Sequence, residues 1–182
     1  MAIAKLFPTA TSDPSTVIAA GDHTNIDETS DVGGGAGDDS YCDTNVNEQL
    51  ATFSFTMSDL PADADTINSA TLRVRANISN APGSNRDTMV WTVSCTNDGA
   101  AVTFDDTNEQ TEGSKTASLT AETVTTLNAE TITVEQTSWS QNKGPDGMFL
   151  RIEFIEIEVD YTPLAVPFLP YYGQEMDPKL RM

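Results

Sequence analysis

Residues 148–161 read MFLRIEFIEIEVDY, and this stretch is the most informative about the fold. Apolar residues occupy every second position up to Phe154, and the alternation then restarts one residue out of phase at Ile155. Successive side chains of a β-strand point to opposite faces, so a one-residue slip moves the apolar set to the other face. The pattern predicts one long closing strand, with a β-bulge or bend near these two residues that keeps both halves facing one core.

Shorter stretches of the same alternation precede the closing strand. Sequences rich in Gly, Pro, Asn and Asp separate nearly all of them, which is typical of turns between strands. No window has the 3.6-residue apolar period of a helix. We expect an all-β, jelly-roll-like antiparallel β-sandwich. The expected strands cover residues 16–20, 50–57, 70–78, 88–95, 101–104, 115–119, 123–127 and 130–135.

Irregular segments flank and interrupt this sandwich. Residues 1–16 contain Pro8 and Pro14 and are expected to form an extended N-terminal arm. The sandwich domain then covers residues 17–162 and includes a long acidic, Gly-rich loop at 21–47, and residues 163–182 form an extended C-terminal arm.

The charge of the chain excludes some partners. Its 182 residues include 9 Lys and Arg against 28 Asp and Glu, a formal net charge of −19, with no basic residue between Lys5 and Arg73. Such a surface repels nucleic-acid phosphates and anionic membranes, so we expect neither as a direct partner. No apolar run approaches the roughly 20 residues that span a bilayer, and none resembles a signal peptide. The protein is therefore expected to be made in the cytoplasm, where Cys42 and Cys95 would be free thiols rather than a disulfide.

The sequence offers little for catalysis. His23 is the single histidine and has no nucleophile at a recognisable spacing. Ser140 and Lys143 match a Ser-x-x-Lys pattern but occupy a polar turn rather than a helix. We therefore predict no catalytic residues, although a glycosidase needs only two carboxylates and the chain has many.

Calcium is the one cofactor for which the sequence provides candidate ligands, because hard cations bind several oxygens from flexible loops. One acidic group adjoins the glycine run and consists of Asp38, Asp39 and Asp43. A second group consists of Asp59, Asp63 and Asp65. Neither matches an EF-hand, and a solvated acidic loop is the alternative.

The two tryptophans could stack on sugar rings. Trp91 lies in phase with Met89 and Val93, which favours core packing. Trp139 precedes a turn and could lie at an edge of the sandwich.

The C-terminal arm is the strongest candidate for a binding site. Its prolines prevent a regular helix, yet it carries several large apolar side chains, which are unusual on the surface of a soluble monomer. We expect an interface with another subunit; the alternative is that the arm folds back on its own domain. The expected interface residues are Phe168, Leu169, Tyr171 and Tyr172.

Two segments resemble jelly-roll virion proteins of tailed bacteriophages. One runs from Trp139 through Gly147 and MFLRIEFIEIEVDY to Tyr161, and the other is the strand INSATLRVR at residues 67–75. The resemblance implies a virion structural protein made in the host cytoplasm, of the head decoration (cement protein) type. Its partners would be the major capsid protein and copies of itself, as a homotrimer. A tail or fibre component with a carbohydrate-binding sandwich is the alternative, and a free polysaccharide-active enzyme is a third class.

Overall fold

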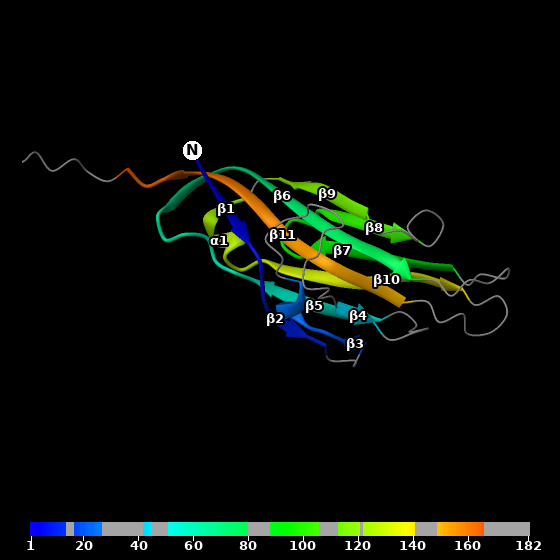
Figure 1. Ribbon diagram of the computed structural model, residues 1–182. Helices are drawn as coiled ribbons and strands as arrows, with labels where there is room; N and C mark the ends of the chain where they lie inside the picture. Colours follow the sequence, from blue (N-terminus) through cyan, green and yellow to red (C-terminus); the bar gives the residue numbers. More distant parts are fainter. Residues whose placement is uncertain are drawn as a thin grey trace, which may run out of the picture.

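The protein is a sandwich of two antiparallel sheets (Figure 1). The computed structural model describes residues 1–13, 17–26, 42–44, 51–79, 88–105, 113–120, 122–140 and 149–165. Within these ranges, sheet A has six strands in the order β3-β4-β11-β6-β9, with β1 also paired to β11, and sheet B has five in the order β2-β5-β10-β7-β8. The strands are β1 (Ala2–Leu6), β2 (Pro8–Ser12), β3 (Ile18–Ala20), β4 (Cys42–Thr44), β5 (Thr52–Met57), β6 (Ala64–Ser79), β7 (Thr88–Cys95), β8 (Ala101–Asp105), β9 (Gly113–Leu119), β10 (Thr131–Ser140) and β11 (Phe149–Pro163).

The strand order is that of a jelly roll. Sheet A contains the run β1-β11-β6-β9 and sheet B the run β5-β10-β7-β8, which is how two Greek keys distribute eight strands between two sheets. Strands β2, β3 and β4 are additions to this plan at the sheet edges. The predicted all-β antiparallel sandwich is confirmed.

The bulge predicted in the closing strand is also present. Ile152 of β11 pairs with Ala76 and Phe154 with Arg75, so Glu153 is the extra residue. Leu150 and Ile152 before the bulge, and Ile155 and the later apolar residues after it, all pack in the core between the sheets. Phe154 differs from the expected pattern: it is fully buried, but it lies opposite Arg75 on the outer face of sheet A.

The core contains the large apolar side chains that face inward from both sheets. Trp91 is fully buried and meets the ring of Phe53 edge-on, with ring centroids 6.3 Å apart. This burial confirms the core assignment of Trp91. Between β7 and β8 the chain turns tightly at Gly99, whose φ of 76° favours a residue without a Cβ.

The prediction of a free N-terminal arm is wrong. Residues of β1 pair with the end of β11, and residues of β2 pair with β5 in the other sheet. Pro8 does not prevent this, because β2 is an edge strand and a bulge follows the proline. The sandwich therefore begins at Ala2 rather than at residue 17.

Two local predictions need correction as well. Residues 123–127 form a helical turn, α1 (Val124–Leu127), instead of a strand, because Thr123 and Thr126 cap each other's backbone N–H groups in a capping box. The expected loop at 21–47 includes the short strand β4 and a 3-10 turn, η1 (His23–Asn25). Of the described helices, none is long and apolar enough to cross a membrane.

Candidate interaction surface

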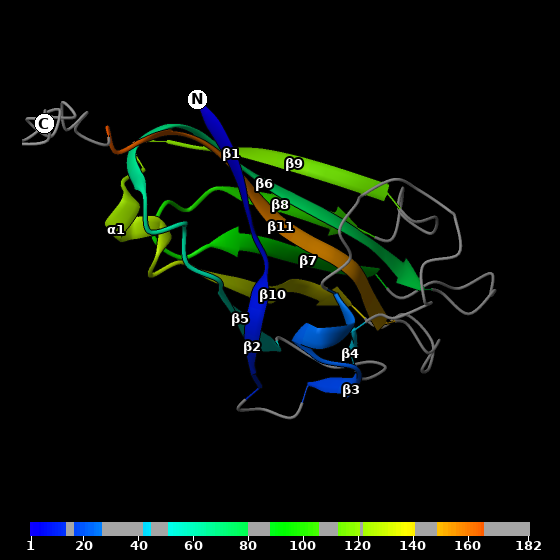
Figure 2. The ribbon, with the colours of Figure 1, turned by 60° about the vertical axis from the view of Figure 1, so that its left-hand side comes forward.

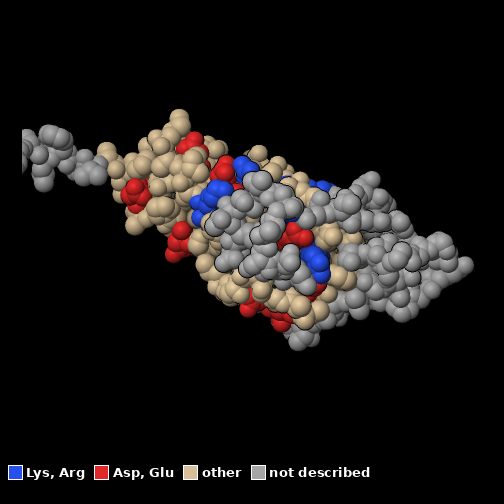
Figure 3. Space-filling view, viewed as in Figure 1, with Lys and Arg blue, Asp and Glu red and all other residues tan. Residues whose placement is uncertain are grey.

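The outer face of sheet A concentrates the basic residues of the described structure. Four of the five described Lys and Arg residues lie there, on β1, β6 and β11. Each forms an ion pair with a carboxylate on the same face, so blue and red side chains adjoin in Figure 3. We call these residues the charge network: Lys5, Arg73, Arg75, Arg151, Asp43, Glu153, Glu156 and Glu158.

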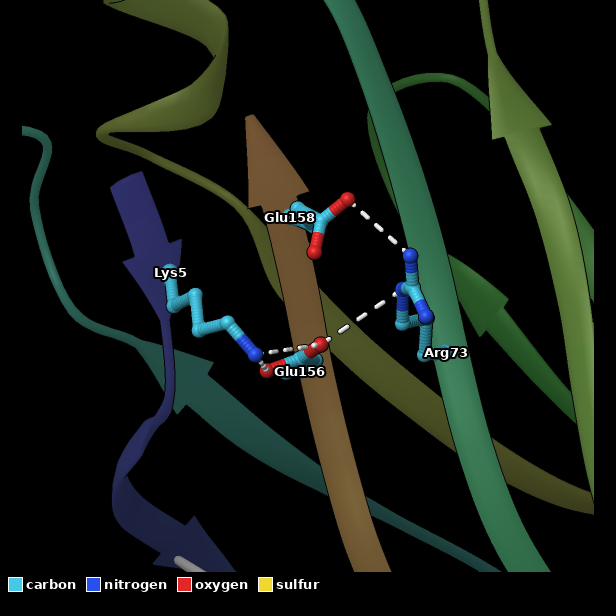
Figure 4. Close-up of polar contacts among 4 residues, drawn as sticks. All are labelled: Lys5, Arg73, Glu156 and Glu158. Atoms are coloured by element: carbon cyan, nitrogen blue, oxygen red, sulfur yellow. Dashed lines mark hydrogen bonds and ion pairs between the residues drawn. The ribbon is translucent and has the colours of Figure 1, made fainter. Parts of the chain in front are cut away.

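Glu156 is the centre of this network (Figure 4). Its side chain is only 2% exposed and lies between the Nζ of Lys5 at 3.0 Å and the Nε of Arg73 at 3.5 Å. Arg73 also donates to Glu158 at 2.9 Å. The three strands β1, β11 and β6 are thus tied together by charge as well as by their backbone hydrogen bonds.

Two further ion pairs extend the network along the sheet. Arg75 lies 3.3 Å from Glu153, the extra residue of the bulge. Burial raises the pKa of the Glu153 carboxyl above its usual value, and this outweighs the opposite effect of the two nearby arginines. Arg151 donates two hydrogen bonds of 2.9 Å to the two oxygens of Asp43, which joins β11 to β4.

This last pair bears on the calcium hypothesis. Asp43 is buried and both of its oxygens accept from Arg151, so it is poorly placed to bind a cation. Asp38 and Asp39 lie outside the described residues. Within the described ranges, no three His, Cys, Asp or Glu side chains gather closely enough to hold a metal ion, and this includes the second group around Asp63.

The other candidate residues from the sequence, His23 and Trp139, make contacts that hold the fold together. His23 donates its backbone N–H to the hydroxyl of Thr11, which also lies 3.1 Å from His23 Nδ1, so the histidine joins η1 to β2. Trp139 is half-buried and packs against the core. Lys143 lies outside the described residues, as do the expected interface residues Phe168, Leu169, Tyr171 and Tyr172.

Exposed apolar side chains gather at one end of the sandwich. The large ones among the described residues are Met1, Ile3 and Leu164, which are 95%, 61% and 54% exposed. The pairing of Ala2 with Tyr161 places the start of β1 beside the end of β11, and Figure 1 shows both leaving at the same end. We call these three residues the apolar end. The predicted C-terminal arm begins here.

Sequence reasoning missed both the charge network and the apolar end. Alternation within residues 70–78 places Arg73 and Arg75 on one face of their strand, and alternation within 148–161 places Glu156 and Glu158 on one face of theirs. Only the pairing of Glu156 with Arg73 and of Glu158 with Thr71 shows that these two faces coincide. The role of Lys5 was hidden because β1 was taken for an arm.

The two cysteines are buried free thiols in different sheets. Burial, aided by the neighbouring charge of Asp43, raises the pKa of the Cys42 thiol to about 12. Burial likewise raises the pKa of Cys95, with a smaller effect from Glu130. Both thiols are therefore protonated and inaccessible near neutral pH.

We expect the folded protein to become less stable as pH rises above about 9. The thiol of Cys42 ionises at 9.0 in the unfolded chain but near 12 in the folded protein. The contribution of this thiol to stability should be constant below this window and fall through it, because the unfolded chain loses the proton first. Urea unfolding at a series of pH values measures the slope. The slope should be smaller in Cys42→Ala, and an equal slope in the variant would contradict this cause.

No protein-family model matches the chain, and no curated protein sequence matches it. The jelly-roll fold, the surface just described and the resemblance of two segments are therefore what indicate a function.

Proposed function

We propose that the protein is a structural component of a tailed-phage virion, a decoration or cement protein that binds the head. The observation that carries this proposal is the apolar end. Met1, Ile3 and Leu164 are exposed where β1 and β11 meet, and the apolar sequence of the C-terminal arm follows directly. Exposed apolar groups concentrated at one place mark interaction sites.

The attachment would combine this fixed apolar end with the arm. Leu164 is still held to the sandwich, because its N–H donates to the carbonyl of Asp63 at 2.7 Å. Residues beyond it supply Phe168, Leu169, Tyr171 and Tyr172 as anchors. Burying aromatic side chains contributes about 25 cal/mol per Å² of apolar area, so several anchors can offset the cost of ordering an arm. Bridging adjacent capsid subunits in this way would stiffen the shell against internal pressure.

The charge of the protein fits an external position on the head. The formal charge of −19 disfavours contact with packaged DNA. The described basic residues on the outer face of sheet A are already paired with carboxylates, so they offer little attraction to phosphates. The partners proposed are the major capsid protein and neighbouring copies of this chain.

Capsid binding tests the proposal. Purified protein is mixed with empty capsids of the phage that encodes it, and the bound fraction is measured by co-sedimentation. We expect the full chain to bind. A chain ending at Ala165, which lacks the arm, should bind at least about 10-fold more weakly. The double variant Ile3→Asp, Leu164→Asp should be weakened as much, because it places charges where apolar side chains would be buried against the capsid. The control Thr52→Asp adds a charge to an exposed residue of sheet B and should bind normally.

The outcomes separate the proposal from its alternative. Undiminished capsid binding by the truncated chain would rule out the arm as the attachment. Binding to purified tails but not to capsids would assign the protein to the tail or fibre. A sugar-binding role would require affinity on a glycan array that Trp139→Ala abolishes, although Trp139 packs against the core.

A further inference from the structure

The outer edge of β9 has no strand partner among the described residues. β9 is the last strand of sheet A, and its seven residues pair with β6 without a bulge. No other described strand pairs with it, and both ribbon views show it at the border of the sandwich (Figures 1 and 2). In an antiparallel strand, alternate N–H and C=O groups point away from the single partner. Those of β9 are therefore available to another strand.

The other edge strands, β1, β2, β3 and β8, carry features that hinder such pairing. β1 has only five residues, one of which is the charged Lys5. β2 contains Pro8 and a bulge, and β3 has only three residues and a bulge. β8 has five residues and ends in Asp105, and the carbonyl of its Thr103 accepts a hydrogen bond from Lys115. Prolines, bulges, charges and short length are the usual means of blocking edge-to-edge association. β9 is longer than these strands and straight.

The side chains of β9 suit pairing with an identical strand. Ser114, Thr116 and Ser118 are exposed and uncharged, and the strand contains no acidic residue. Its one charge, Lys115, is directed toward the neighbouring strand β8, where its Nζ lies 5.0 Å from the centre of the Phe104 ring. In a protein of formal charge −19, two copies repel over most of their surfaces. This edge is one of the places where they can approach.

We propose that β9 pairs antiparallel with β9 of a second copy, around a twofold axis through Thr116. This register pairs all seven residues, because Thr116 is the central one. It places Thr116 opposite its own copy and Ser114 opposite Ser118, which are favourable cross-strand hydroxyl pairs. Lys115 then lies opposite Ala117. An axis through Lys115 would instead set two like charges opposite each other, which destabilises a sheet.

Within the described part of the chain, the shape of the sandwich leaves room for the second copy. β8 packs against both β6 and β9, so it is set back from the border that β9 forms (Figure 2). Sheet A of one copy can then continue into sheet A of the other. The contact is separate from the apolar end and does not depend on the proposed capsid role.

Disulfide trapping tests the register. Residues opposite each other in antiparallel strands have Cα atoms about 4.5–5.5 Å apart, within the range of a disulfide. Thr116→Cys should therefore give a covalent dimer on mild oxidation. Ser114→Cys is the matched control, because the two copies of residue 114 would be four residues out of register, about 13 Å apart. The native thiols are buried and should not compete. Equal cross-linking of both variants, or of neither, would overturn the register.

Solution mass tests the dimer itself. Sedimentation of the purified chain across a concentration series should give a dimer, and Thr116→Lys should weaken it by about 10-fold or more, since two like charges face each other on the axis. Thr52→Lys adds the same charge to sheet B and should leave the dimer intact. Circular dichroism and melting temperature establish that each variant is folded. A monomer at all concentrations, or the trimer implied by the resemblance, would overturn the β9 pairing while leaving capsid binding as a separate question.

Discussion

Deleting Ile157 should prevent the protein from folding, whereas deleting Glu153 should not. Ile157 is a fully buried core residue of β11, opposite Leu72. Its loss shifts the following residues by one, so Val159 turns outward and Glu158 turns toward the core. Each buried apolar side chain lost costs about 1.5–3 kcal/mol, and an unpaired buried carboxylate costs more. The sum approaches the whole stability of a domain, about 5–15 kcal/mol.

Glu153 is the matched control because it is the extra residue of the bulge. Removing it leaves Ile152 opposite Ala76 and Phe154 opposite Arg75, as they already are, so no side chain changes face. The ion pair with Arg75 is lost, which costs about 1 kcal/mol or somewhat more where the pair is partly buried. Circular dichroism and urea unfolding of the two variants measure the contrast. Two equally damaged variants would show that the bulge, and not the facing of side chains, is the requirement.

Replacing Glu156 by alanine should lower the free energy of unfolding by about 3–5 kcal/mol, as expected when one member of a buried ion pair is removed. The carboxylate is 2% exposed, and Lys5 and Arg73 both pair with it. Without it, the two cations on the strands that flank β11 are left with one fewer carboxylate between them. Glu135→Ala, at an exposed position of β10, should change the stability by no more than about 0.5 kcal/mol.

Urea unfolding of both variants provides the measurement. A loss below about 1 kcal/mol for Glu156→Ala would mean that the network behaves as an ordinary surface ion pair. An apolar replacement of the whole unit, Lys5→Met with Arg73→Met and Glu156→Leu, should recover much of the loss, because desolvating the charges offsets most of their attraction. That result would assign the network to orienting β1 on sheet A rather than to net stability.

Local pattern predicted most of the sandwich. Strict alternation in the closing strand predicted its length, most of its core residues and the bulge, because side chains two residues apart in a strand point to the same face. The same reasoning failed at residues 123–127, where a capping box of two threonines produces a helical turn that alternation cannot distinguish from a strand. It failed again at residues 1–12, where strands too short to show a pattern are held by partners far along the chain.

The candidate surfaces divide in the same way. The apolar character of residues 163–182 could be predicted from their composition, because large apolar side chains favour burial whatever the fold of the chain. The charge network could not, because Lys5 and Glu156 are 151 residues apart and meet only when β1 docks beside β11.

Alternation of apolar and polar residues was enough to predict an antiparallel sandwich closed by residues 148–161, with a phase shift in the middle of that strand. This was possible because the buried face of a strand can be identified from residues that are close together in the sequence. Which strands are neighbours became known from the tertiary structure alone. It shows that β11 lies between β1 and β6, where a buried glutamate joins the three strands, and that β9 lies at an edge of sheet A. Strand order depends on contacts between distant segments, and no local pattern records it.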